Sequence, residues 1–487
     1  MYAINAPMDL NINPVEEAKQ PFSPGWAMFI AIWIVCLLAG AALTLQMKQP
    51  VLGAIVAGLP TLAGILISPI FSLCCICLVL PLSGSINFEG VFTADRAIGA
   101  LATAGILIHC KFFRGSVRIS GSPLLPLFLI AGWSTLSALW SVNPQYAFFS
   151  ALSLVQLSFW VWALWNAIAY RGNYIWPLRC YAAGMLVVVM RLYLSGGLSR
   201  IKDEGNAARL TLESTSRDNV NPNDFAAFLV PAFFIAVYLF LRDPAKFLRI
   251  IWVICAMVFP IMIVLTGARS ALAGLLCALL VTALTFHHFI RARGALIGIV
   301  IAGICMVGGI FYVLSSDLSR SDAVQRILDP RLRGKGMNNR LMLMERGLTH
   351  IFSRPLLGTG CHNYVLTYQE KWAIHNDPML IAAELGIFGG FLYFWFFWKL
   401  GKTVFGTRAP PEKWFARSLV IFLFVTGLAH PIFAAKSFWF FSVCGAAVAF
   451  RARQSEENAA MDLAYQYASM PPPDLQLSQH RWGHSYA

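Results

Sequence analysis

The most constraining feature of this chain is a series of apolar runs, each about 17–22 residues long, between residues 26 and 450. A helix of that length crosses a hydrocarbon core roughly 30 Å thick, and it satisfies its backbone hydrogen bonds internally, as lipid requires. The 487 residues are 58% hydrophobic and 12% charged, whereas average soluble domains are roughly 25% charged. The sequence therefore predicts an all-α, polytopic transmembrane helical bundle over residues 26–450, with about 12–14 spans.

Basic residues gather in every second loop between the apolar runs. The basic loops lie near residues 111–118, 171–179, 242–249, 291–293 and 399–417. The short loops near residues 141–146 and 432–436 hold almost no positive charge. Because cytoplasmic loops carry the excess of Lys and Arg, the basic loops are predicted to be cytoplasmic. The net charge of +14 then reflects membrane topology, and nucleic acid is not an expected partner.

The same rule makes residues 1–25 a cytoplasmic N-terminal tail and residues 451–487 a cytoplasmic C-terminal tail. The C-terminal tail is polar and contains Pro471, Pro472 and Pro473. Such a composition buries too little apolar surface to order a chain, so this tail is expected to be disordered.

Two long polar loops, residues 195–222 and 315–376, are predicted to face outward. The first leads into Asn221-Pro222-Asn223-Asp224, a turn signal whose Asn or Asp is suited to cap the next helix. The second contains a predicted amphipathic helix at residues 337–352, which we expect to lie on the membrane surface or on the bundle. Its apolar stripe consists of Leu341, Met344, Leu348 and Phe352.

A cluster of polar residues stands where the second loop re-enters the membrane. It comprises His375, Asn376, Asp377, Glu384, Gly386 and Gly389. The two glycines are expected to permit close helix packing. An ionisable group at that depth costs free energy unless it has a partner or a function. A histidine near neutrality can accept a proton from a hydroxyl nucleophile, although a hydrogen-bonded loop residue is the alternative for His375. Asp377 and Glu384 share a helical face and either orient His375, pair with an arginine or are structural.

Arginines form a second outward-facing group, with Arg209 and Arg217 near the first loop, Arg269 at a helix junction and Arg340 in the second loop. Arginine keeps its charge and presents a planar fork of donors that suits phosphate oxygens. A lipid-linked diphosphate is an anion of the required kind. Arg269 has little room to leave the rim of the bundle, so it is either a structural anchor or a substrate ligand. Metal binding is not supported by the spacing of any His, Cys or acidic residues.

Four stretches resemble a known family. His375-Asn376, followed after nine residues by Gly386 and after two more by Gly389, matches the periplasmic motif of bacterial O-antigen ligases and of O-antigen and exopolysaccharide polymerases. The same count from His362-Asn363 reaches Ala373, so only His375 fits. The other similar stretches are Asn221-Pro222-Asn223, Thr266-Gly267-Ala268-Arg269-Ser270, and Arg340 followed by the turn at residues 355–360. The resemblance covers residues 205–400.

The resemblance implies a metal-independent membrane glycosyltransferase that needs no cofactor. Its donor would be an undecaprenyl-diphosphate-linked glycan, used at the periplasmic face of the bacterial inner membrane among membrane lipids. A ligase passes the glycan to lipid A-core in lipopolysaccharide synthesis, and a polymerase passes it to a growing glycan, including exopolysaccharide. His375 corresponds to the catalytic histidine and Arg269 to a diphosphate-binding arginine, with Arg340 a further candidate. Arg217 and Arg209 both remain candidates for an arginine near the first loop.

A second class of function is a polysaccharide or lipid transporter (flippase). Such a protein is expected to carry paired charges and broken helices near the bilayer midplane. Here the strongest charges lie at the outer rim, which favours an enzyme. A membrane assembly protein without chemistry is a third reading.

Overall fold

The computed structural model describes residues 24–45, 47–82, 94–114, 123–169, 174–194, 221–286, 330–370, 373–408 and 410–469. All regular secondary structure in these segments is helical. The α-helices are α2 (Pro24–Leu45), α3 (Pro50–Ile67), α4 (Pro69–Val79), α5 (Ala94–Arg114), α6 (Leu124–Leu136), α7 (Pro144–Ala169), α8 (Ile175–Leu194), α10 (Pro222–Arg242), α11 (Lys246–Thr266), α12 (Arg269–Phe286), α15 (Pro330–Ser353), α16 (Tyr364–Tyr368), α17 (Asp377–Phe405), α18 (Pro410–Gly427) and α19 (Lys436–Ser469).

The predicted all-α polytopic membrane protein is confirmed. Among the described residues, five helices are long and apolar enough to cross a membrane: α7, α8, α10, α11 and α17. Several shorter apolar helices accompany them. The count of about 12–14 spans stays a prediction, because the apolar run near residues 294–314 lies outside the described segments.

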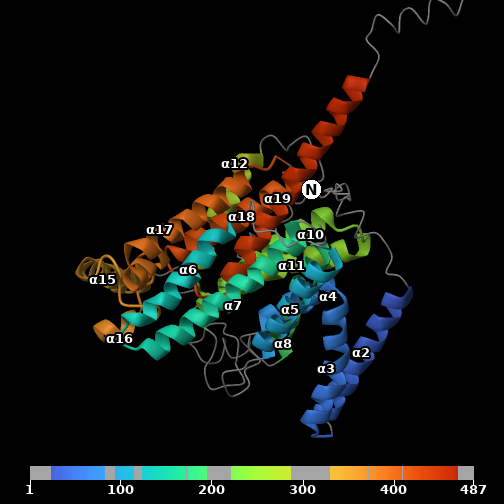
Figure 1. Cartoon of the computed structure of the whole chain (residues 1–487), viewed down its shortest axis with the longest axis horizontal. Coiled ribbons are helices and arrows are strands. Elements are labelled where there is room, and N and C mark those ends of the chain that lie inside the picture. The colour runs from blue at the N-terminus through green and yellow to red at the C-terminus, as the bar shows by residue number, and fades with distance from the viewer. Residues whose placement is uncertain are drawn as a thin grey trace, which may run out of the picture.

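The bundle is organised around α10. The most apolar stretch of this helix is 78% buried, more than that of the other four long helices. α10 packs against α8, α11, α12 and α18, while α17 lies alongside α6, α18 and α19 (Figure 1). Large aromatic side chains fill the interior, including Trp165, Tyr181, Tyr238 and Trp439. Many Phe, Leu and Ile side chains are exposed on the outside of the bundle, as expected where lipid takes the place of water.

The loops that the charge pattern assigns to opposite sides lie at opposite ends of the bundle. At one end, Trp140 Nε1 donates to the carbonyl of Leu357 at 3.0 Å, which joins the weakly charged loop at residues 141–146 to the second long loop. At the other end, Arg242 Nη2 donates to the Glu412 carboxylate at 3.0 Å. The two groups of loops are therefore separated by the length of α10. Which end is cytoplasmic stays a prediction.

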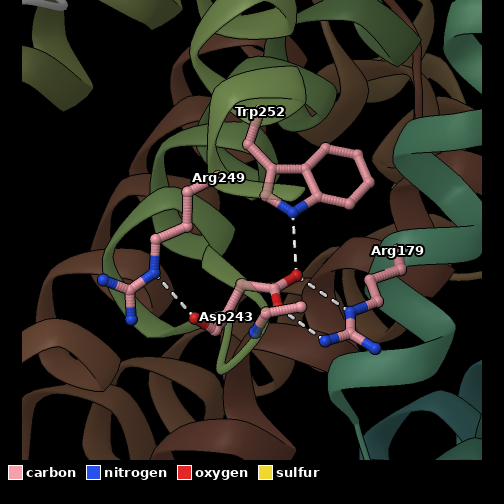
Figure 2. Close-up of polar contacts among 5 residues, drawn as sticks. Arg179, Asp243, Arg249 and Trp252 are labelled. Atoms are coloured by element: carbon pink, nitrogen blue, oxygen red, sulfur yellow. Dashed lines mark hydrogen bonds and ion pairs between the residues drawn. The ribbon is translucent and has the colours of Figure 1, made fainter. Parts of the chain in front are cut away.

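A buried ion pair stabilises the basic end, where α10 turns into α11 (Figure 2). Asp243 is fully buried and accepts from Arg179 Nε at 2.9 Å, while Trp252 Nε1 donates to the same carboxylate at 2.8 Å. Arg249 Nε donates to the backbone carbonyl of Asp243 at 2.7 Å. These contacts satisfy the buried charges and fasten α8 to the turn, so these arginines are structural.

The C-terminal tail differs from its expected disorder. α19 continues past its buried first part as far as Ser469, and its far end projects from the bundle (Figure 1). The segment is rich in Ala, Glu and Gln, which favour helix, and Arg453 pairs with Glu457 one turn later at 2.8 Å. The expectation of disorder is thus corrected for residues 451–469. Residues 1–23 and 470–487 lie outside the described segments.

Candidate functional site

The polar run that precedes α17 forms the start of that helix. The Asn376 Oδ1 atom accepts a hydrogen bond from the backbone N–H of Met379 at 3.0 Å, which makes Asn376 the N-cap. Pro378 suits the first turn because its missing N–H would have no helical partner there. Asn376 Nδ2 also donates to the carbonyl of Leu428 at 2.9 Å. One side chain therefore starts α17 and ties it to the end of α18, which fixes the backbone next to His375.

The two carboxylates of α17 hold neighbouring backbone segments. Asp377 is 1% exposed, and its Oδ1 accepts from the N–H of Phe433 at 3.1 Å. Glu384 Oε2 accepts from the N–H of His362 at 3.0 Å. The sequence left open whether these acids orient His375, pair with an arginine or are structural. Their contacts are structural: Asp377 anchors the α18–α19 turn, and Glu384 anchors the second long loop.

α17 is broken at Gly386, whose φ of +69° and ψ of −171° are not helical. The carbonyls of residues 383–385 accept hydrogen bonds from Thr359 N–H at 3.0 Å, Gly360 N–H at 2.8 Å and Trp133 Nε1 at 2.9 Å, in that order. Beyond the break, Ile387 N–H donates to the Pro355 carbonyl at 2.8 Å. The break therefore leaves none of these backbone groups unsatisfied, which apolar surroundings require.

Glycine is required at the break by both space and conformation. A Cβ atom on Gly386 would lie 2.0 Å from the Leu356 carbonyl oxygen. The positive φ also excludes most other residues. On Gly389 a Cβ would lie 2.3 Å from the Cβ of Leu385, which folds back across the break. The expectation that these glycines permit close helix–helix packing is corrected, because Gly386 admits a loop backbone and Gly389 admits a residue of its own helix.

His375 lies half-buried beside a second histidine. The centroid of its ring is 6.1 Å from that of His430, with 24° between the ring planes. His375 Nδ1 is buried and has no hydrogen-bond partner within the described segments. Burial lowers the pKa of His375, and Arg340 and His430 lower it further. The imidazole therefore favours its neutral form, which can accept a proton.

His430 is held by an acid from the first turn of α10. Asp224 Oδ1 lies 2.8 Å from His430 Nε2, with the imidazole 5% exposed and the carboxylate 43% exposed. Asn221 caps α10 by accepting from the N–H of Asn223 at 2.9 Å, as the sequence suggested for this run. Because Asn221 makes the cap, the carboxylate of Asp224 is available to the histidine.

Two of the four predicted arginines are described, and they lie near each other. Arg340 is half-buried on α15, and Arg269 is the first residue of α12. Burial lowers the pKa of the Arg340 guanidinium, and the positive charge of Arg269 lowers it further. The charge of Arg340 also lowers the pKa of His375, so positively charged groups from α12 and α15 lie near the start of α17. Arg209 and Arg217 lie outside the described residues.

α15 confirms the predicted helix in the second loop, but its apolar stripe does not face the bundle. Gly347 lies on the buried side, where an added Cβ would be 2.7 Å from Ile374 Cδ1. Leu343 is buried on that side as well. The predicted stripe faces outward, with Leu341 58%, Leu348 49% and Phe352 76% exposed. Among the described segments, no part of the bundle covers this stripe.

Sequence reasoning missed His430 and Asp224. The only local sign in the sequence is that His430 is ionisable and stands directly before Pro431, at the end of an apolar run. Asp224 was noticed only as a possible cap. Their contact joins residues 206 positions apart, so it depends on the packing of α10 against α18.

Residues 251–394 match the family model for the O-antigen ligase. This match supports an O-antigen ligase-related family for the chain. The O-antigen ligase match extends from α11 into α17 and contains Arg269, Arg340 and His375, whereas Asp224 and His430 lie outside it. No curated protein matches the chain significantly.

Proposed function

We propose that this protein is a membrane glycosyltransferase that transfers or polymerises an undecaprenyl-diphosphate-linked glycan. The observation that carries the proposal is the grouping of Arg269, Arg340 and His375 at one end of the bundle. Burial lowers the pKa of the Arg340 guanidinium, and the positive charge of Arg269 lowers it further because the two groups repel. A bound diphosphate would relieve that repulsion and accept hydrogen bonds from both planar forks.

The reaction follows from the chemistry of these groups. An acceptor hydroxyl oxygen attacks the anomeric carbon, and the bond from that carbon to the diphosphate oxygen breaks with its electron pair on phosphate. Arg269 and Arg340 stabilise the negative charge that develops there. His375 takes the proton from the hydroxyl and later releases it to solvent. The products are a new glycoside, inverted at the anomeric carbon, and undecaprenyl diphosphate.

We place this site at the periplasmic face of the bacterial inner membrane. The proposal is supported by two short loops with almost no positive charge, near residues 141–146 and 432–436, and by the basic loops at the far end of α10. A lipid-linked donor would enter from the bilayer, so its diphosphate would reach the rim where the arginines lie. The acceptor is either lipid A-core or a growing glycan, corresponding to ligase and polymerase activity.

The test is a transfer assay with purified protein in detergent and lipid-linked repeat units, with and without lipid A-core. Lengthened glycan without core identifies a polymerase, and transfer only to core identifies a ligase. We expect His375→Ala to abolish both. His362→Ala is the matched control, because it alters the other His-Asn pair and should retain activity. Full activity in His375→Ala would refute the proposed mechanism.

A further inference from the structure

The strongest unassigned feature is the pair formed by His430 and Asp224. The pair brings α10 and the α18–α19 turn to the side of His375, outside the segment that matches the O-antigen ligase family. Both partners belong to ordered elements. Asp224 stands in the first turn of a capped helix, and the His430 N–H donates to the Thr426 carbonyl at 2.8 Å.

The geometry limits how the two histidine rings can move. His430 Nε2 is fixed by the Asp224 carboxylate at 2.8 Å, and the ring is nearly parallel to that of His375. The Nδ1 atoms of both rings are buried and lack hydrogen-bond partners within the described segments. The turn that carries His430 is itself tied to α17 at two points, through Asn376 and Asp377.

We propose that His430, anchored by Asp224, is a positioning residue for His375 that holds its ring in place and in the form that accepts a proton. This inference rests on the proposed role of His375 in glycan transfer. The carboxylate fixes His430, and His430 in turn acts on His375.

The charged groups around His375 come from five elements, including α10 through Asp224, which pairs with His430. Arg340 on α15 acts on it directly, and Arg269 on α12 acts on Arg340. On α17, Asp377 is engaged by the backbone of the α18–α19 turn. His430 in that turn lowers the pKa of His375, in the same direction as Arg340 and burial. Replacing His430 with a residue that cannot be charged should therefore raise the pKa of His375.

Nuclear magnetic resonance of protein labelled at the histidine Cε1 carbons measures this effect without any substrate. The His375 signal is identified by its loss in His375→Gln. In His430→Gln the midpoint of the His375 titration should move to higher pH by at most about half a unit, the effect of a full unit charge roughly 6 Å away in water. His430→Phe keeps an aromatic ring but cannot be protonated, and it should give the same shift.

Two further variants test the path of the effect. Asp224→Asn placed in the His430→Gln background should add little, because the carboxylate acts through His430. His362→Gln changes an exposed histidine and should leave the His375 midpoint unchanged. An unchanged midpoint in folded His430→Gln and His430→Phe overturns the inference.

The transfer assay separates this inference from the proposed function. The acid limb of kcat/KM should move to higher pH in His430→Gln, by the amount seen in the titration. A shifted titration in a protein without transferase activity supports the positioning role and rejects the proposed function. Transfer activity with an unshifted titration rejects the positioning role alone.

Discussion

Gly386→Ala is the substitution that tests most directly how the site is built. The Cβ atom would lie 2.0 Å from the Leu356 carbonyl oxygen, so the turn at residues 354–360 and α17 cannot keep their present separation. Alanine also disfavours the backbone conformation of φ +69° and ψ −171°. Either the turn moves away from α17, or α17 straightens and the turn loses its hydrogen bonds to the backbone of that helix.

The magnitude follows from the contacts at the break. Strained backbone of this kind costs about 1–3 kcal/mol for a residue other than glycine. Moving the turn breaks up to three hydrogen bonds, which involve Thr359, Gly360 and Ile387. At about 1 kcal/mol each, the total loss in the free energy of unfolding is roughly 4–6 kcal/mol. A straightened α17 would recover some helical bonds but would release the loop beside His375.

Thermal unfolding of the purified protein in detergent measures this loss, and the transfer assay measures its effect on the site. Gly390→Ala is a matched control in the same helix, because its Cβ would find its nearest neighbour, the Ala382 Cβ, at an ordinary 3.6 Å. We expect a large fall in the unfolding temperature for Gly386→Ala and little change for Gly390→Ala. Equal stability and equal activity in the two variants would refute this account of the break.

Three further predictions concern the charged groups. Asp243→Asn leaves Arg179 buried without its counter-charge and should lower the free energy of unfolding by about 3–5 kcal/mol, as measured by thermal unfolding. Adding Arg179→Met removes the unpaired charge and should restore part of that loss. Arg269→Lys should lose most turnover with folding intact, because lysine lacks the planar fork, and strong activity of this variant after chelation would contradict the proposed role. The pKa of His375 lies below its ordinary value, so the imidazole stays neutral in mildly acidic buffer. The value of kcat/KM should therefore begin to fall only below about pH 6.5. A fall that begins above that pH would count against His375 as the base.

The sequence predicted the helical membrane architecture because long apolar runs leave a chain few alternatives in lipid. It also placed Arg269, Arg340 and His375 in one outward-facing group, since motif order and loop charge are local properties. The structure brings these three residues to the same end of the bundle.

What escaped prediction depends on contacts between distant segments. The pairing of Asp224 with His430 needs α10 and α18 to pack side by side, which no local pattern encodes. Gly386 was read as a helix-packing glycine because an isolated glycine in an apolar run looks the same in either role. Its true partner, the turn at residues 354–360, is recognisable only from the backbone positions.

The break at Gly386 separates the site mechanically from the bilayer. Residues 387–405 form the long apolar part of α17, which tilts when the surrounding membrane becomes thinner or thicker. Residues 377–385 are fastened to the second loop and to the α18–α19 turn, whereas the long part is tied to that loop at its first residue, Ile387. A single glycine joins the two parts, so a tilt of the long part can be absorbed there. The geometry around His375 should consequently be set by the loops and stay constant across membranes of different lipid composition.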